Sequence, residues 1–189
     1  MAQFYCFTEE GLVEAVVLAG QALAIDPSYA PAAALMSACR RAQRAHGWSA
    51  LSDEDIAEAC RLARQALNAE RDDAETIYQA AWTLFYLAGE AALAAEAFDR
   101  ALALNPNAAH AWTARGNIYA LRNQPEAAIE AIERARRLSP FDPYTSRYAH
   151  TIAVANLAAR RFEQAIESAD RGTMSPSKSA SSCPQRQRR

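Results

Sequence analysis

Apolar residues recur every three or four positions along most of the chain, which is the period of an α-helix with one buried face. The segment from Glu9 to Ala24 shows this period first, and Thr8 stands where a hydroxyl can cap the amino end of a helix. Its apolar positions are Leu12, Ala15, Val16, Ala19 and Leu23. No segment alternates apolar and polar residues as a half-buried strand does, so the pattern predicts an all-α protein.

Later segments repeat this pattern. The segment from Asp53 to Ala69 opens on an acidic first turn, which suits the positive end of a helix dipole. Its apolar face consists of Ile56, Ala59, Ala63 and Ala66. A helix is also predicted from about Pro143 to Ala158, with Tyr148, Ile152 and Leu157 among its residues. The face of another helix is marked by Phe162, Ala165, Ile166 and Ala169.

Two prolines, Pro106 and Pro140, end similar stretches that lie 34 residues apart. The residues between them repeat in register, which defines the units 75–108 and 109–142. The first unit carries Tyr78, Phe85, Gly89, Ala94, Phe98, Ala101 and Pro106. The second carries Trp112, Gly116, Tyr119, Ala128, Ile132, Ala135 and Pro140. This pattern resembles the tetratricopeptide repeat (TPR), a pair of antiparallel helices with the consensus W-x2-L-G-x2-Y, then A-x3-F, then P.

The repeat pattern has a mechanical basis. Small residues such as Gly116 and Ala128 stand where two helices cross closely, and large ones such as Trp112 and Tyr119 fill the space between units. A single unit cannot bury its own apolar face, so the units must stack, and a proline ends each second helix. The resemblance therefore implies one all-α domain, an alpha-alpha superhelix of the TPR solenoid type.

The same frame extends in both directions from the two clean units. Toward the amino terminus it gives a partial unit, 1–29, and a longer unit, 30–74. Toward the carboxyl terminus it gives a last, incomplete unit, 143–172. Residues 173–189 are rich in Ser, Pro, Gln and Arg and have no apolar period, so we predict a disordered tail.

Two features depart from a regular repeat. The long unit exceeds the usual repeat length by about ten residues, and we place this surplus in a loop at 44–51 that contains Trp48. The loop is either a binding element or a segment whose tryptophan packs over its own helix pair, and the second interpretation is favoured. The other departure is Trp82, which stands at the position that Gly116 occupies in the next unit. We expect splayed helices or a local shift of register there.

Charge argues against nucleic-acid binding. The chain has 20 Lys and Arg against 22 Asp and Glu, a net charge of −2. Four of the basic residues lie in the predicted tail, namely Lys178, Arg186, Arg188 and Arg189, so the folded part is mildly acidic and has no basic stripe. Weak contact of this tail with a polyanion is the less favoured alternative. Because neither a signal peptide nor a membrane span is found, we expect a cytoplasmic protein that does not bind membranes.

The sequence offers no catalytic motif. The three histidines, His46, His110 and His150, fall in different units without a metal-binding spacing, and no glycine-rich phosphate loop is present. The cysteines show no metal or redox spacing, and Cys39 and Cys60 are expected to be free thiols in the helical core. We therefore predict a protein that is not an enzyme, with no catalytic residue, no metal and no cofactor.

What remains is the concave groove that the first helices of stacked repeats line. In the TPR frame its positions are the second, fifth, ninth and twelfth of each unit. We predict a partner-binding groove formed by Thr76, Gln79, Thr83, Tyr86, His110, Thr113, Asn117, Arg147 and His150, with Ala120, Val154 and Leu157 beside them. Such a strip suits an extended peptide or a partner helix. Each of these residues, taken singly, is more often an ordinary solvated side chain.

The earlier groove positions weigh against one TPR subtype. These positions hold Pro31, Ala34, Ala38 and Arg41. TPR proteins that grip the terminal carboxylate of chaperones use several Lys, Arg and Asn residues there, and Asn117 and Arg147 alone do not form that clamp.

Several stretches, taken in order, are similar to a bacterial TPR region that follows a class III adenylate cyclase domain or a winged-helix DNA-binding domain. They are Phe4–Leu12, Ala24–Ala32, His46–Ser49, Leu87–Glu90 and Asp99–Asn107, within a resemblance over about residues 3–171. The resemblance implies a sensory or regulatory module and transfers no catalytic residue. The abrupt change in composition after Gly172 departs from it and suggests a truncated gene product.

The leading hypothesis is thus a non-enzymatic TPR scaffold that binds a peptide or a partner protein in its concave groove. A second hypothesis is a homo-oligomer, because incomplete terminal units expose apolar faces that another copy can cover. A third is a regulatory or sensory fragment that acts in trans on a cyclase or a transcription regulator. The sequence does not identify the partner.

Overall fold

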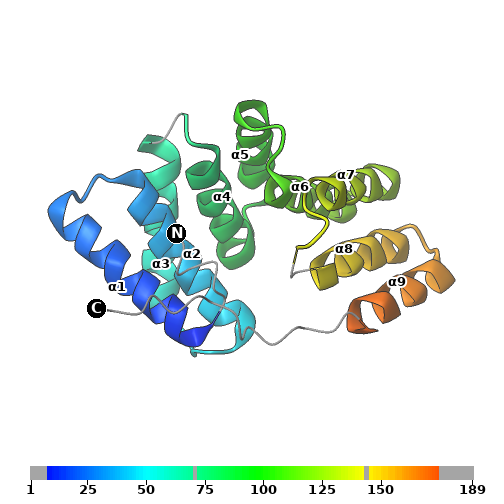
Figure 1. The fold of residues 1–189 in the computed structure, drawn as a ribbon, viewed down its shortest axis with the longest axis horizontal. Helices are drawn as coiled ribbons and strands as arrows, with labels where there is room; N and C mark the ends of the chain where they lie inside the picture. The colour runs from blue at the N-terminus through cyan, green and yellow to red at the C-terminus, as the bar shows by residue number, and fades with distance from the viewer. Residues whose placement is uncertain (1–7, 70–71, 143–144, 175–189) are drawn as a thin grey trace.

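The structure is a computed structural model that describes residues 8–69, 72–142 and 145–174. Within these ranges the chain forms nine α-helices and no strand, which confirms the predicted all-α class (Figure 1). The helices are α1 (Glu9–Ile25), α2 (Ala30–His46), α3 (Asp53–Ala69), α4 (Ala74–Ala88), α5 (Ala91–Leu104), α6 (Ala109–Leu121), α7 (Pro125–Leu138), α8 (Thr145–Ala158) and α9 (Phe162–Met174).

Local sequence explains where the helices begin and end. The Thr8 hydroxyl accepts a hydrogen bond from the Gly11 amide at 3.0 Å, so the predicted amino-terminal cap of α1 is confirmed. The Asp73 carboxylate caps α4 in the same way. Gly47 and Gly89 end α2 and α4 with φ of 68° and 70°, a left-handed conformation in which glycine carries no steric penalty.

The predicted boundaries agree closely with the described helices. The segment from Glu9 to Ala24 forms α1, which is one residue longer, and Asp53 to Ala69 coincides with α3. Residues 143–144, at the predicted start of α8, lie outside the described residues. The last helix continues to Met174, two residues beyond the predicted end of the solenoid at 172. The rest of the predicted tail, 175–189, and residues 1–7 lie outside the described residues.

The helices form antiparallel pairs that stack into a curved solenoid. Neighbouring even-numbered helices contact each other at α2 with α4 and at α6 with α8, whereas neighbouring odd-numbered helices approach little. The even row is therefore the shorter, inner row, and the solenoid curves around it. Figure 1 shows α2, α4, α6 and α8 along this inner side and the odd-numbered helices around them.

The surplus of the long unit is not confined to a loop, so the expectation of a loop over 44–51 is only partly correct. Helices α2 and α3 have 17 residues each, whereas α4 has 15 and α5 has 14. The connection between α2 and α3 spans 47–52, and the corresponding connection in the next unit is only 89–90. The extra residues thus lengthen both helices as well as their connection.

The core consists largely of alanine, with a few large side chains at fixed places in each unit. Phe98 on α5 and Ile132 on α7 occupy the same position of the repeat, and both are fully buried. Phe98 belongs to a cluster that joins α4, α5 and α6, with Trp82 and Phe85 packed against it. No helix in the described part of the chain combines the length and the apolar character needed for a membrane span.

Candidate functional site: the concave face

The concave face is formed by α2, α4, α6 and α8, and the predicted groove residues lie on the last three of these helices. Four of them are buried, namely Thr76, Gln79, Thr83 and Thr113, so the expectation that all groove positions are exposed is wrong for these. For the three of these residues on α4 the reason lies in α2, whose groove positions Ala34 and Ala38 are small and fully buried. Small side chains let neighbouring helices approach closely.

In the amino-terminal half, polar side chains join α2 to α4. The Arg41 guanidinium donates a 3.0 Å hydrogen bond to Gln79 Oε1, and Gln79 Nε2 donates at 2.7 Å to Glu75 Oε1. One turn farther along, Ser37 Oγ lies 3.3 Å from Thr83 Oγ1. Because the bond between Arg41 and Gln79 satisfies polar groups that are removed from water, it fixes the two helices in one register.

In the carboxyl-terminal half, a second set of polar contacts joins α6 to α8. The Thr151 hydroxyl lies 3.2 Å from Asn117 Oδ1 and 3.0 Å from the Arg147 carbonyl, and these two acceptors share its proton. Asn117 Nδ2 donates to the Thr113 carbonyl at 2.9 Å. The Tyr148 hydroxyl donates a 2.6 Å bond to Oδ2 of the buried Asp142. Burial, and then this bond to a carboxylate, raise the pKa of Tyr148 well above its ordinary value.

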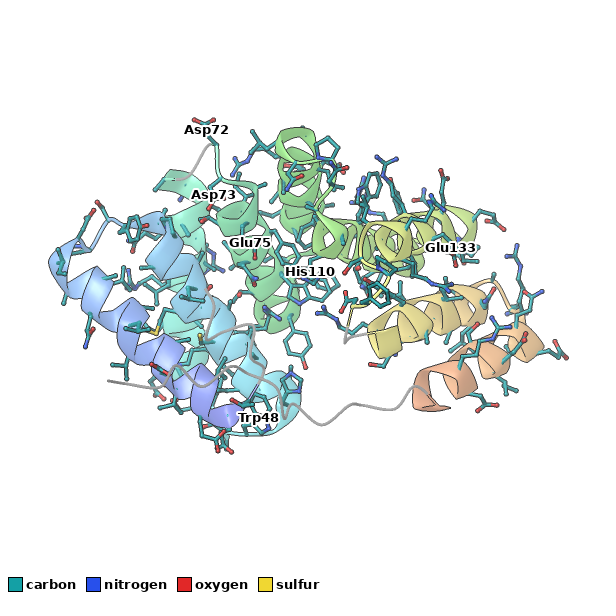
Figure 2. All side chains as sticks on the ribbon, in the orientation of Figure 1. Trp48, Asp72, Asp73, Glu75, His110 and Glu133 are labelled. Carbon is teal, nitrogen blue, oxygen red and sulfur yellow. The ribbon has the colours of Figure 1, made fainter. Side chains whose placement is uncertain are left out.

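The inner row is interrupted between α4 and α6, whose backbones scarcely approach each other. The space between them is bridged by rings: Tyr78 on α4 stacks on His110 on α6, with centroids 6.1 Å apart and planes inclined by 19°. Figure 2 labels Glu75 and His110 near the middle of the solenoid, one on each of these two helices. The concave face therefore has two polar halves that meet at an aromatic junction.

His110 stays predominantly neutral at pH 7 for a physical reason. Burial is the main cause that lowers its pKa, and the nearby Arg147 lowers it further, while Asp142 and Glu75 oppose the shift. Its Nδ1 lies 3.9 Å from Asp142 Oδ2. The half-buried ring, stacked on Tyr78, therefore adds a neutral, flat surface to the concave face.

The remaining predicted residues are open to solvent to different degrees. Tyr86 is 46% exposed and His150 is exposed, whereas Asn117 and Arg147 are half-buried. Tyr86 lies three residues after Thr83 and seven after Gln79, so it shares their helical face, the one that meets α2. The accessible part of the predicted site is thus smaller than the sequence suggests. It consists of Tyr86, His110, Asn117, Arg147 and His150.

The segment that contains Trp48 lies at one edge of this face. Trp48 stacks on His46, with centroids 4.5 Å apart, and packs against the apolar cluster of α1 and α2. This agrees with the favoured interpretation, in which the tryptophan covers its own helices. Burial, Arg147 and Arg41 lower the pKa of His46, so the end of α2 lies within electrostatic reach of α8 across the groove.

The sequence did not single out two polar residues of this face, Glu75 and Asp142. Glu75 stands one position before the first groove position of its unit, and Asp142 is the last residue of the next unit, in the connection after α7. Neither position has a signal in the repeat consensus. Both are recognised only once their partners, Gln79 and Tyr148, are seen beside them.

The site's chemistry is that of hydrogen bonds, rings and arginine charges. Within residues 8–69, 72–142 and 145–174, no group of three or more His, Cys, Asp or Glu side chains is placed to hold a metal ion. Cys39 and Cys60 are free and buried, as predicted. Burial raises the pKa of Cys39 to about 12, which makes this thiol a poor nucleophile.

Comparison with known proteins supports the repeat assignment. Residues 78–143 match the tetratricopeptide repeat family. No curated protein sequence matches the chain significantly.

Solved structures resemble the chain over most of its length. TTC0263, a thermophilic TPR protein of Thermus thermophilus, aligns with a TM-score of 0.63 and 17% identity over 89% of this chain and 85% of its own. YrrB, described as a TPR protein with an unusual peptide-binding site, aligns with a TM-score of 0.56 and 21% identity over 86% and 77%. MamA aligns with a TM-score of 0.57 and 20% identity over 88% and 89%. At these identities the similarity shows the fold alone.

Proposed function

We propose that this tetratricopeptide repeat chain is a non-enzymatic interaction module that binds a peptide or a partner protein along its concave face. TPR proteins generally act as scaffolds for protein partners, and YrrB is described as having a peptide-binding site. The observation that carries the proposal is the accessible strip of Tyr86, His110, Asn117, Arg147 and His150 on a buried polar framework. Free thiols at Cys39 and Cys60 suit the reducing cytoplasm, where we place the protein.

The buried framework explains how such a strip can bind. Arg41 with Gln79 and Asn117 with Thr151 hold the inner helices in place before a ligand arrives. A surface that is already ordered loses less conformational entropy on binding, so more of the contact energy appears as affinity. Tyr86 adds a large ring that is ordered by only two torsions.

The experiment compares a groove variant with a matched surface variant. The groove variant combines Tyr86→Ala and His150→Ala, because both side chains are exposed and neither makes a bond that holds two helices together. Asn117→Ala is unsuitable, since it also breaks the contact with Thr151. The control is Phe162→Ala, an aromatic residue of similar exposure on the outer helix α9.

Each variant is immobilised, and proteins captured from an extract of the source organism are quantified against the unaltered chain. We expect the groove variant to lose its partner and the control to retain it, with helical circular dichroism unchanged in both. Retention of the partner by the groove variant contradicts the proposal.

A second candidate function is regulation through self-association, which exposed apolar residues on the first and last described helices support. Ile166 on α9 is 63% exposed, whereas Ala95 on α5, at the same repeat position, is 4% exposed because the next unit covers it. Val13 and Val17 on α1 are exposed at the other end. Light scattering tests this candidate: we expect a concentration-dependent dimer that Ile166→Glu disrupts. A monomer at micromolar concentration contradicts it.

The resemblance to TPR regions attached to cyclases and transcription regulators supports a role in which the chain acts in trans on such a protein. A cyclase or winged-helix regulator encoded beside this gene is the expected companion. Its absence from the neighbourhood in the source genome contradicts that part of the proposal.

A further inference from the structure

Charged residues are distributed unequally between the inner and outer helices. The inner helices α2, α4, α6 and α8 together hold five arginines and a single acidic residue, Glu75. The outer helices α1, α3, α5, α7 and α9 hold seven arginines and fifteen acidic residues. The chain as a whole is slightly acidic, so this separation is invisible in its net charge. The inner helices therefore carry a net positive charge and the outer helices a net negative charge.

The arginines of the inner row do not all face the groove. Arg115 pairs with Asp99 on α5, and Arg40 lies 3.7 Å from Asp55 on α3, so both are turned toward outer helices. Arg41 lies at a groove position and contacts Gln79 on α4. Arg44 is exposed one turn later on the same face of α2. Arg147 approaches the groove from α8 on the opposite side.

Side chains on three helices sense this positive charge. At Tyr78 on α4, burial is the main influence and raises the pKa, while Arg147 and Arg41 each oppose it more strongly than Glu75 or Asp142 adds to it. At His110 on α6, Arg147 is the strongest charged influence. At His46 on α2, Arg147 and then Arg41 are the charged influences beside burial, and both lower the pKa. These influences agree with the excess of arginine over acidic residues on the inner helices.

From this separation of charge we infer that the segment bound in the groove is acidic, an inference that rests on the proposed function. A peptide rich in Asp and Glu is attracted by Arg44 and Arg147 at the two sides of the groove and repelled by the acidic outer helices. Electrostatic complementarity of this kind selects the partner and orients it before close contact forms. Because salt screens these charges, the groove attracts such a peptide most strongly at low ionic strength.

The test is an unbiased selection. A random library of displayed 12-residue peptides is selected against the immobilised full-length chain, and recovered peptides are synthesised with a fluorescent label for anisotropy measurements. We expect enrichment of Asp and Glu among the recovered peptides, and weaker binding as salt rises.

Variants then locate the charge effect. We expect Arg44→Gln combined with Arg147→Gln to reduce the affinity for a selected acidic peptide roughly tenfold, since each charge at an accessible site contributes modestly. The double variant with Lys at the same positions should recover most of the affinity because it keeps both charges. Arg137→Gln, an exposed charge on the outer helix α7, is the matched control and should leave the affinity unchanged.

The outcomes separate this inference from the function on which it rests. If the recovered peptides lose affinity for the variant with Tyr86→Ala and His150→Ala but are not enriched in Asp and Glu, the groove binds peptides and the charge inference is overturned. If acidic peptides bind equally well to the Gln double variant, it is overturned as well. If no peptide is recovered at all, peptide binding itself fails and the inference fails with it.

Discussion

The two central helix pairs, α4–α5 and α6–α7, share one repeat frame but pack in different ways. In α6 the eighth position is Gly116, where an added Cβ would lie 3.1 Å from Ile132 Cδ1 and 3.3 Å from the Ala128 carbonyl oxygen. In α4 the same position is Trp82, whose ring stacks on Phe85 and lies against Phe98. One pair is held by close backbone approach and the other by aromatic side chains.

The repeat period thus determines which residues face each other, while side-chain volume determines how closely the helices approach. The backbones of α4 and α5 approach less extensively than those of α6 and α7, in line with the expected splaying at Trp82. Helix α4 nevertheless runs unbroken from Ala74 to Ala88. The helix pair α4–α5, with its aromatic contacts, also lies next to the interruption of the inner row between α4 and α6.

The largest effect should come from Phe98→Ala in the aromatic pair. Phe98 is fully buried against Trp82 and Tyr78, so its truncation leaves a cavity that costs about 3–5 kcal/mol of the free energy of unfolding. Ile132→Val, at the same position of the other pair, should cost about 0.5–1.5 kcal/mol. Urea denaturation followed by circular dichroism measures both. A cost of Phe98→Ala below about 1.5 kcal/mol contradicts the view that α4–α5 depends on its aromatic contacts.

Gly116→Ala probes the close approach in the other pair. The new methyl group meets both a side chain and a backbone oxygen, so we expect a loss of about 1–3 kcal/mol from overpacking. Gly20→Ala on α1 is the control, because its added Cβ lies 3.6 Å from Met36 Cε, an ordinary contact. That substitution should stabilise α1 by up to about 1 kcal/mol. Stabilisation by both substitutions would show that α6 and α7 are not closely packed.

Tyr148→Phe removes the hydrogen bond to Asp142 in the carboxyl-terminal half of the groove. The buried carboxylate then loses a partner, at a cost of about 1–3 kcal/mol. The corresponding change in the amino-terminal half is Ser37→Ala, which removes a weaker neutral contact with Thr83 and should cost about 1 kcal/mol. Thermal unfolding of the two variants compares the halves. A larger loss for Ser37→Ala would reverse their order.

The smallest effect concerns pH. The pKa values of His46 and His110 are lowered in the folded chain, chiefly by burial, so the unfolded chain binds protons more readily. The folded chain therefore has its full stability with respect to these two histidines above the ordinary histidine pKa of 6.5, and it loses stability as the pH falls below that value. We expect the melting temperature to fall between pH 7.5 and 5, and His110→Gln to flatten part of this dependence. A melting temperature that rises on acidification contradicts these directions.

The sequence predicted the helices and their pairing well because both depend on local patterns. The period of apolar residues placed α1 and α3 almost to the residue, and the prolines set the repeat length. It placed the predicted groove residues on the inner helices, but it did not predict which of them are accessible. Whether Gln79 and Thr83 are exposed depends on how closely α2 packs on α4, and that distance is set by Ala34 and Ala38 in a different unit.

Two features of the site could not be predicted from the sequence, for another reason. The role of Asp142 depends on a partner, Tyr148, in the following helix, and no repeat position marks it. The separation of charge between inner and outer helices was present in the sequence, but it appears only when residues are assigned to the two rows. Net charge, which averages the rows, conceals it.

The central claim is that the concave face is the binding surface. Site-specific photocrosslinking tests it most directly, with a photoreactive phenylalanine analogue placed at Tyr86 on α4 or at Phe162 on α9 in the full-length chain. After irradiation in cells of the source organism, we expect one dominant crosslinked partner from position 86, weakened by Arg44→Gln with Arg147→Gln, and no crosslink to that partner from position 162. Crosslinking of the same protein from position 162 but not from position 86 would contradict the claim.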